Sequence, residues 1–309
     1  MIRSSAAAGV LILAVLAAAG PGLAEPWESL ESPDVSVRFA GPSRGAASEV
    51  ARVYPKARLG LEGVLPWKLN IRPTILLAHD KAAFRERAGN DLTLAIAVPG
   101  HALIILDAGR MAGVPGSLEG VLRHELCHLL LHERIPEKHL PRWLDEGVCQ
   151  WASNGVTDLL TGGRAPRLED AAVSRRLLPL AHLTDTFPDS HQGLILAYEQ
   201  SRSFVDFLVT TYGRGRFLEL LGRLRGDDVE ISLRAVYGVS LDELEREWQT
   251  SLMKRFTWIT FLSSNIYEIL FFGAALLVIA GALRLFLRRR SRPQEDDDQD
   301  TTSFYPPRT

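Results

Sequence analysis

From Ser117 onward, the apolar residues of this 309-residue chain recur with the period of an α-helix. Residues three and four apart lie on one face of a helix, so this pattern predicts amphipathic helices that pack into a core. We expect these helices over residues 118–133, 142–154, 192–212, 214–224 and 241–256. Ser240 and Glu243 have the spacing of a capping box that would begin the last of them.

The first half of the chain carries mixed signals. "DVSVRFAG" and "PTILLAHD" are typical of short strands, and "LTLAIAVPG" with "ALIILDAG" predicts a hairpin around Pro99 and Gly100. "SEVARVYPKARLGLEGVL" has helix-period apolar positions interrupted by Pro55, and "KAAFRERAG" is typical of a short helix. We predict an α+β fold with a small α/β lobe over residues 25–116 and a mainly helical lobe over residues 117–262.

The N-terminal segment, residues 1–24, has the features of a secretory signal peptide. It has one early basic residue, Arg3, then an apolar run, and small residues before the expected cut after Ala24. An uncleaved anchor is the alternative, but the apolar run is short and wrongly flanked for a membrane span. We therefore expect the body of the chain to be exported.

A second apolar run, Ile269 to Leu283, lies near the other end of the chain, with Glu268 and Arg284 at its edges. With its flanking residues it reaches the about twenty residues that a bilayer needs, which predicts one transmembrane helix over residues 265–287. The arginines that follow place the C-terminus in the cytoplasm and the body on the periplasmic side of the cell membrane. Residues 288–309 are predicted to form a disordered cytoplasmic tail, because the segment "PQEDDDQDTTSFYPPRT" is acidic and has too little apolar content to fold.

Composition excludes one class of partner. The chain is 46% hydrophobic, enough for a core, and its formal net charge is −2 with a pI near 6.5. A protein without a basic face has no electrostatic attraction for phosphate backbones. Nucleic acid is therefore not an expected partner.

The segment His124-Glu125-Leu126-Cys127-His128 fits the pattern H-E-x-x-H. Two histidines four residues apart lie one turn apart on one face of a helix, so both imidazoles can reach one metal ion. The glutamate between them then lies near a water molecule bound to that ion. The surrounding run has helical periodicity, which favours this interpretation over a chance match.

A catalytic zinc site needs a third protein ligand and one open position. His132 is nearest in sequence, but it lies about 12 Å along the helix axis from His124, too far to share an ion. After a proline-flanked loop, "LPRWLDEGVCQW" is expected to form a second helix that faces the first. This helix offers Glu146 as the first candidate and Asp145 as the second.

The segments "HELCHLLLH" and "LPRWLDEGVCQWAS" together resemble the gluzincin zinc metallopeptidases, in particular the bacterial peptidase MA-like domains. In that family H-E-x-x-H is followed by W-L-x-E-G, whose glutamate is the third zinc ligand. The resemblance implies zinc bound by His124, His128 and Glu146, with Glu125 as the general base. It also implies a thermolysin-like arrangement in which the zinc site lies between the two lobes.

A further segment, "LAYEQSRSFVDFLVTTYG", resembles the part of these enzymes in which a tyrosine supports the developing oxyanion. This implies that role for Tyr198, and an ordinary aromatic residue of an amphipathic helix is the alternative. The Gly-Ala-Met-Glu-Asn motif of the related aminopeptidases is missing upstream, which favours an endopeptidase. We therefore predict a membrane-anchored, extracytoplasmic zinc metallopeptidase that acts on peptide or protein substrates.

A non-catalytic, zinc-stabilised binding module at the membrane surface is the alternative function. A fourth protein ligand, such as Cys127 or His132, would favour it over an enzyme. Cys127 and Cys149 each lie three residues after a predicted ligand. In an oxidising compartment they could form a disulfide, and two buried thiols or a thiolate bound to zinc are the other options.

Overall fold

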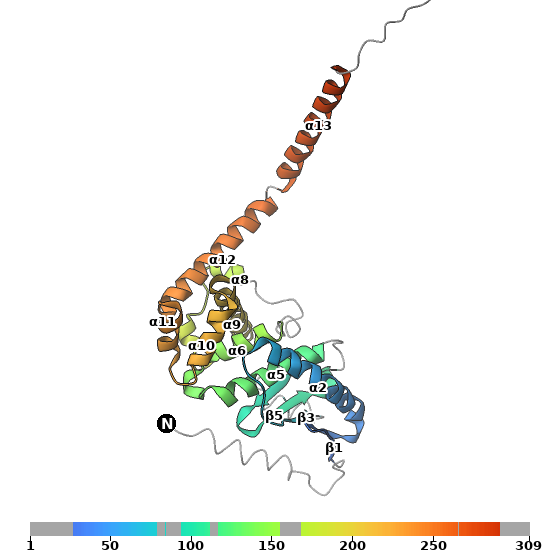
Figure 1. Cartoon of the computed structure of the whole chain (residues 1–309), viewed down its shortest axis with the longest axis vertical. Helices are drawn as coiled ribbons and strands as arrows, with labels where there is room; N and C mark the ends of the chain where they lie inside the picture. The colour runs from blue at the N-terminus through green and yellow to red at the C-terminus, as the bar shows by residue number, and fades with distance from the viewer. Residues whose placement is uncertain are drawn as a thin grey trace, which may run out of the picture. The chain divides into compact units, whose positions relative to one another are not determined.

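The structure is a computed structural model of the chain (Figure 1). It describes residues 27–78, 84, 94–111, 117–154, 168–264 and 266–290. The predicted signal peptide, most of the predicted short helix around Phe84 and the tail beyond residue 290 lie outside these residues. By its contacts the chain divides into two units, Met1–Met253 and Lys254–Thr309.

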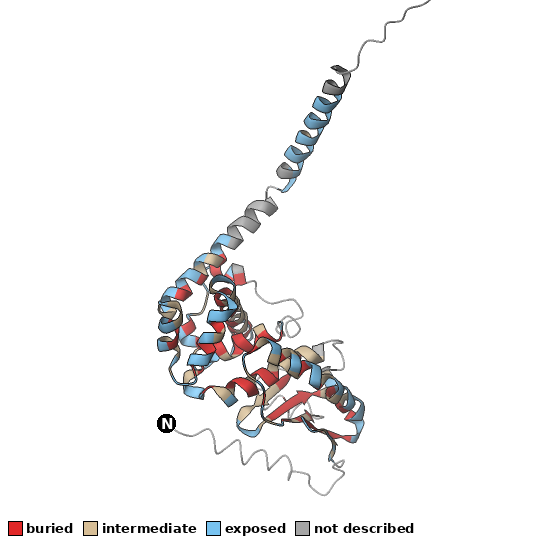
Figure 2. Ribbon diagram, in the orientation of Figure 1, coloured by how far each residue is buried: buried red, intermediate tan, exposed pale blue. Residues whose placement is uncertain are grey.

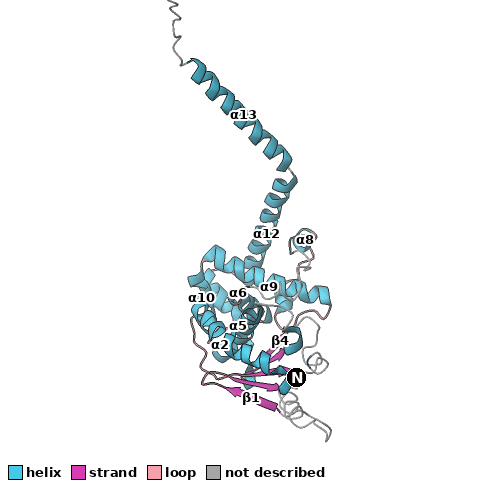
Figure 3. Cartoon of the chain, turned by 90° about the vertical axis from the view of Figure 1, so that its right-hand side faces the viewer, coloured by secondary structure: helices cyan, strands magenta, loops and turns pink. Residues whose placement is uncertain are grey.

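Five strands of the described residues form one mixed sheet in the order β1-β2-β3-β5-β4. Figure 3 shows the strands in magenta. They are β1 Trp27–Glu31, β2 Ser36–Ala40, β3 Thr74–Ala78, β4 Ala95–Val98 and β5 Leu103–Asp107. β2, β3 and β5 are parallel, whereas the edge strands β1 and β4 are antiparallel to their neighbours. The predicted hairpin is confirmed, because β4 and β5 pair across the 3₁₀ turn Pro99–His101.

The central strands bury side chains on both faces of the sheet. The main core takes alternate residues of β3 and β5, namely Ile75, Leu77, Ile104 and Leu106. On the other face, Leu103 and Ile105 pack with Phe84 in a smaller cluster. Successive side chains of a strand point to opposite faces, so both faces need apolar residues when both are covered.

One long helix, α2 (Arg44–Val64), packs against β2 and contains Pro55 in its interior. The sequence pattern predicts an interruption at Pro55, but the helix continues through this residue. An interior proline lowers the stability of a helix by about 3 kcal/mol. Its buried residues recur every three or four positions: Ala47, Val50, Tyr54, Ala57 and Leu61. At roughly 25 cal/mol per Å² of apolar surface, burial of this stripe outweighs the lost hydrogen bond.

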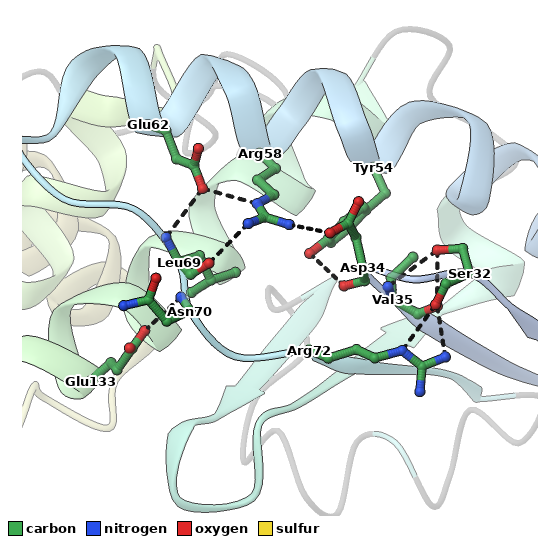
Figure 4. Close-up of polar contacts among 10 residues, drawn as sticks. All are labelled: Ser32, Asp34, Val35, Tyr54, Arg58, Glu62, Leu69, Asn70, Arg72 and Glu133. Carbon is green, nitrogen blue, oxygen red and sulfur yellow. Dashed lines mark hydrogen bonds and ion pairs between the residues drawn. The ribbon is translucent and has the colours of Figure 1, made fainter.

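Polar contacts join α2 to the segments on either side of it (Figure 4). The guanidinium of Arg58 donates to Glu62 Oε1 at 2.9 Å and to Asp34 Oδ1 at 2.7 Å. It also donates to the carbonyl oxygen of Leu69 at 3.0 Å. Arg58 therefore connects α2 both to the residues before β2 and to the residues that follow the helix.

Beyond the sheet the described chain is helical, as predicted. The helices are α4 Ala108–Met111, α5 Ser117–Arg134, α6 Arg142–Ala152, α8 Leu168–Val173, α9 His191–Tyr212, α10 Arg214–Arg223, α11 Val229–Tyr237 and α12 Leu241–Ser264. The five predicted helices are confirmed as α5, α6, α9, α10 and α12, and α12 continues past its predicted end. The capping box is confirmed too, since the Ser240 amide donates to Glu243 Oε2 at 2.8 Å and the Glu243 amide to Ser240 Oγ at 3.3 Å.

The sheet and the helices share one hydrophobic core (Figure 2). Its buried residues come from β2, β3 and β5 as well as from α2, α5, α6 and α9. The predicted α+β, thermolysin-like fold with two lobes and a transmembrane helix is therefore wrong. The described chain is mainly helical with one mixed sheet. The two predicted lobes share one core because α2, which packs on the sheet, also packs directly against α5.

The second unit contains the end of α12 and the helix α13 (Ile266–Arg290). Within the described residues, no helix has the length and the apolar content needed to cross a membrane. This finding contradicts the predicted transmembrane helix over residues 265–287 and the membrane anchor that depended on it. Glu268 and Arg284 confine the uncharged part of α13 to residues 269–283, which is shorter than the about twenty residues a bilayer requires.

Candidate metal centre

The H-E-x-x-H residues lie in the middle of α5, which packs against α2, α6 and β4. Leu122, Leu126, Leu129 and Leu130 of this helix are buried in the core. Burial of that side sets the rotation of α5 and turns the two histidines in one direction. The rings of His124 and His128 are accordingly neighbours, with centroids 4.8 Å apart.

Glu125 lies between the two histidines in sequence and is 7% exposed. Its carboxylate is hydrogen-bonded to the backbone of Ala97 in the edge strand β4. Burial raises the pKa of Glu125, although His124 and His128 oppose this rise. A carboxyl group with a raised pKa is suited to exchange protons near neutral pH.

The helix α6 carries Asp145 and Glu146 and packs against both α5 and α9. Gly147 permits the contact with α9, because a Cβ atom at this position would lie 2.5 Å from the carbonyl oxygen of Ser201. No other residue type allows so close an approach. The glycine of W-L-D-E-G therefore brings Glu146 within reach of two neighbouring helices.

Three potential ligand atoms from α5 and α6 form one cluster. The Nε2 atoms of His124 and His128 are 3.2 Å apart. Glu146 Oε2 lies 3.6 Å from the first nitrogen and 3.5 Å from the second. Ligands bound to a tetrahedral zinc ion at about 2.0–2.1 Å lie about 3.3 Å from one another. The predicted ligands are thus brought together at the spacing of a tetrahedral metal site.

The charges in this cluster favour a cation. Burial alone would raise the pKa of Glu146, but His128 and His124 lower it to about 2. Burial would likewise lower the pKa of His128, but Asp145 and Glu146 raise it well above its ordinary range. The carboxylates therefore stabilise a positive charge at this point, and either a proton or a metal ion can supply it.

Asp145, the second candidate for the third ligand, lies elsewhere in the cluster. Its Oδ1 accepts a hydrogen bond from Nδ1 of His128 at 2.9 Å, and its Oδ2 accepts one from Nε2 of His132 at 3.0 Å. A histidine that binds a metal usually donates its second ring nitrogen to a carboxylate. The structure thus distinguishes the two carboxylates, since Glu146 meets the Nε2 atoms and Asp145 meets Nδ1.

The contact between His132 and Asp145 was missed by the sequence analysis. His132 was considered there only as a ligand, and it was set aside because of its distance from His124. Its spacing of four residues from His128 was the available signal, because such residues share one face of a helix.

Tyr198 of α9 borders the cluster, with its hydroxyl oxygen 3.5 Å from Glu146 Oε1. Its ring packs edge-on against Phe187, with the centroids 5.3 Å apart. The side-chain amide of Gln150 donates to the backbone carbonyl of Tyr198 at 3.1 Å. Burial, together with the charge of Glu146, raises the pKa of Tyr198. The hydroxyl therefore stays protonated and can donate a hydrogen bond.

Cys127 and Cys149 are buried free thiols, and the thiol of Cys149 donates to Asp145 Oδ1 at 3.9 Å. Burial raises the pKa of Cys149, which keeps the thiol protonated and makes it a poor ligand. The described residues contain a second group of potential ligands, His128, Asp145 and Cys149. It is the weaker candidate, because Asp145 already holds Nδ1 of His128.

A family model described as the Peptidase MA superfamily matches residues 96–254. The match covers more than half of the chain and includes the clustered residues His124, His128 and Glu146, together with Glu125 and Tyr198. No curated protein matches the chain.

Solved structures that match the chain share little of its sequence. Native yeast LTA4 hydrolase is 15% identical with a TM-score of 0.41, over 79% of this chain and 42% of that one. Legionella pneumophila aminopeptidase A in complex with aspartic acid is 14% identical with a TM-score of 0.43, and the match covers 74% of this chain and 28% of that one. A two-domain M1 zinc metallopeptidase bound to L-tryptophan is 14% identical with a TM-score of 0.38, and the match covers 72% of this chain and 52% of that one. The chain thus spans about half or less of the length of these proteins.

Proposed function

The chain belongs to the Peptidase MA superfamily, and from this premise we propose that it is a zinc-dependent metallopeptidase. One observation carries the proposal. The Nε2 atoms of His124 and His128 and the Oε2 atom of Glu146 lie 3.2 to 3.6 Å from one another, which is the spacing of a tetrahedral site.

The chemistry of the three groups fits zinc. Two imidazole nitrogens and one carboxylate oxygen are a typical ligand set of catalytic zinc, whereas calcium and magnesium prefer oxygen ligands. In the described residues this group has three members, His124, His128 and Glu146, which leaves the fourth position open. A zinc ion held there would polarise a peptide carbonyl and lower the pKa of a water molecule.

Two further residues have roles in the proposed reaction. Glu125 takes the proton of the attacking water and delivers it to the leaving amine. The hydroxyl of Tyr198 donates a hydrogen bond to the substrate oxygen as negative charge develops on it. The raised pKa values of both groups support these roles, since Glu125 can hold a proton in transit and Tyr198 keeps its own.

The edge strand β4 offers a place for the substrate backbone. Ile96, Ala97 and Val98 are only partly buried, and β4 pairs with β5 on one side alone within the described sheet. An extended peptide can add to such an edge through backbone hydrogen bonds. Binding by strand addition does not require a free terminus of the substrate. The sequence also lacks the Gly-Ala-Met-Glu-Asn motif of the aminopeptidases, so we propose endopeptidase action.

The proposal is tested by the variant Glu125→Gln. We expect it to fold and to bind one zinc ion per chain while peptide cleavage falls by at least about 100-fold, because the proton acceptor is lost. Glu137→Gln, an exposed glutamate in the loop before α6, is the matched control and should retain full activity. A Glu125→Gln protein as active as the wild type would overturn the proposed mechanism.

The alternative of a non-catalytic binding module needs a fourth protein ligand. His132 is hydrogen-bonded to Asp145, and Cys127 is a buried free thiol. Neither belongs to the group of His124, His128 and Glu146, so the enzyme is the better supported function.

Endopeptidase action has its own test. Fluorogenic peptides with blocked ends and matched peptides with a free N-terminus should be cleaved at similar internal bonds. Stepwise release of single residues from only the free peptides would identify an aminopeptidase instead.

A further inference from the structure

His132 lies one turn after His128 in α5 and is hydrogen-bonded to Asp145, the residue that also contacts His128. Its Nε2 donates to Asp145 Oδ2 at 3.0 Å, while the other oxygen of Asp145 accepts from His128 Nδ1 at 2.9 Å. The side chains of His128, Asp145 and His132 are 12%, 15% and 23% exposed. One carboxylate thus joins two imidazoles, of which only His128 is a proposed ligand.

We propose that His132 is a positioning residue of the metal centre, which fixes Asp145 so that Asp145 can hold His128 in its metal-binding orientation. The inference rests on the proposed function, because it assumes that the cluster binds a metal ion. It assigns to His132 no contact with the metal or the substrate.

The geometry of a carboxylate explains why a second partner matters. The terminal torsion of aspartate is broad, as is that of histidine, so one hydrogen bond between them leaves both groups free to turn together. A second hydrogen bond to the other oxygen fixes the plane of the carboxylate. That plane determines the direction of the hydrogen bond to Nδ1 and hence the direction of Nε2 of His128.

The spacing along α5 makes the arrangement possible. His128 and His132 are four residues apart, so their side chains lie side by side on one face of the helix. Asp145 comes from the facing helix α6 and reaches both rings. Its contacts therefore also set the position of α6, which carries the adjacent proposed ligand Glu146.

The other proposed histidine ligand has no such support. Nδ1 of His124 is buried and has no hydrogen-bond partner among the described residues. Its orientation is set by packing, whereas that of His128 is set by hydrogen bonds. Loss of His132 should therefore act on one ligand and weaken metal binding without abolishing it.

A purely structural role for His132 makes a different prediction. A histidine that only pairs with an acid would change the free energy of unfolding and leave the metal affinity of the folded protein unchanged. Metal affinity is therefore the discriminating measurement, and the absorption spectrum of the Co²⁺ form adds a readout of ligand geometry.

The experiment compares zinc affinity, measured by chelator competition, in the full-length wild type, His132→Ala, His132→Gln and the exposed control His182→Ala. We expect His132→Ala to bind zinc about 10- to 100-fold more weakly and to have an altered Co²⁺ spectrum. His132→Gln should recover most of the affinity, because its amide nitrogen can donate to Asp145 Oδ2. His182→Ala should behave as the wild type.

A double-mutant cycle tests whether His132 acts through Asp145. In an Asp145→Ala background, His132→Ala should not weaken zinc binding further. Unchanged affinity and an unchanged spectrum in His132→Ala would overturn the inference, and so would additive losses in the cycle. If His132→Ala does not fold, affinity in His132→Gln equal to that in the shorter His132→Asn would overturn it. A wild type that binds no zinc would instead contradict the proposed function.

Discussion

Gly147 of α6 lies against Ser201 of α9 so closely that a Cβ atom on the glycine would be 2.5 Å from the serine carbonyl oxygen. Both residues are in helices, so the contact joins two backbones that have little freedom to move apart. Glu146 and Tyr198 precede these two residues on their helices, and their side chains approach each other at the metal cluster. The close approach of α6 and α9 is thus a condition for the geometry of the site.

Replacing Gly147 with alanine should lower the free energy of unfolding by about 1–3 kcal/mol, because overpacking forces the two helices apart. It should also weaken zinc binding, since Glu146 is the adjacent residue. Chemical denaturation and chelator competition measure the two effects. The control is Gly222→Ala in α10, where no atom lies within 4 Å of the added carbon; equal stability of the two variants would contradict the prediction.

Removing the hydroxyl of Tyr198 should reduce kcat about 10²- to 10³-fold with little change in KM, because the hydrogen bond acts on the transition state. Steady-state kinetics of Tyr198→Phe with a cleavable peptide measure this. Tyr212→Phe is the matched control, because that hydroxyl donates to Glu247 away from the cluster. Comparable losses in both variants would show that the effect is structural.

The metal-free protein should have a characteristic pH dependence of stability. The pKa of His128 is raised above 6.5, so the stability contributed by its protonated form is present below that pH and is lost as the pH rises through the raised value. The pKa of Glu146 is lowered from 4.5 to about 2, so its contribution is present above pH 4.5 and is lost as the pH falls toward 2.

These two groups should therefore stabilise the metal-free protein most between about pH 4.5 and 6.5. Urea denaturation in the presence of a chelator, at a series of pH values, measures the profile. His128→Gln should remove the loss of stability on the alkaline side, and His182→Gln should keep it. A wild-type protein whose stability rises steadily from pH 6 to 9 would contradict the assignment.

Arg58 should contribute more to stability than an arginine in an exposed ion pair. Its guanidinium holds Asp34, Glu62 and the Leu69 carbonyl (Figure 4), so Arg58→Ala should cost about 2 kcal/mol. Arg52→Ala, which removes an exposed pair with Glu49, should cost less than about 1 kcal/mol. Thermal unfolding of both variants gives the comparison, and zinc affinity should be unchanged in each.

Local rules were sufficient to predict most elements of the fold. The alternation in "DVSVRFAG" and the helical period from Ser117 onward correspond to β2 and to the helices α5, α6, α9, α10 and α12. These patterns can be recognised in the sequence because each element buries one face. The spacing of the residues on that face is fixed by the geometry of the helix or strand itself. Longer-range effects were not visible. The continuity of α2 through Pro55 depends on the core it covers, and the predicted transmembrane helix was contradicted.

The sequence by itself determined that His124 and His128 share one face of a helix, because a spacing of four residues does so in any α-helix. The resemblance implied Glu146 as the third ligand, but only the tertiary structure decided where Glu146, Asp145 and His132 lie around the two histidines. The two carboxylates are adjacent in sequence, and which one meets the Nε2 atoms depends on the rotation and position of α6 against α5. Those quantities are set by packing across several elements, including the contact of Gly147 with α9, and no local pattern encodes them.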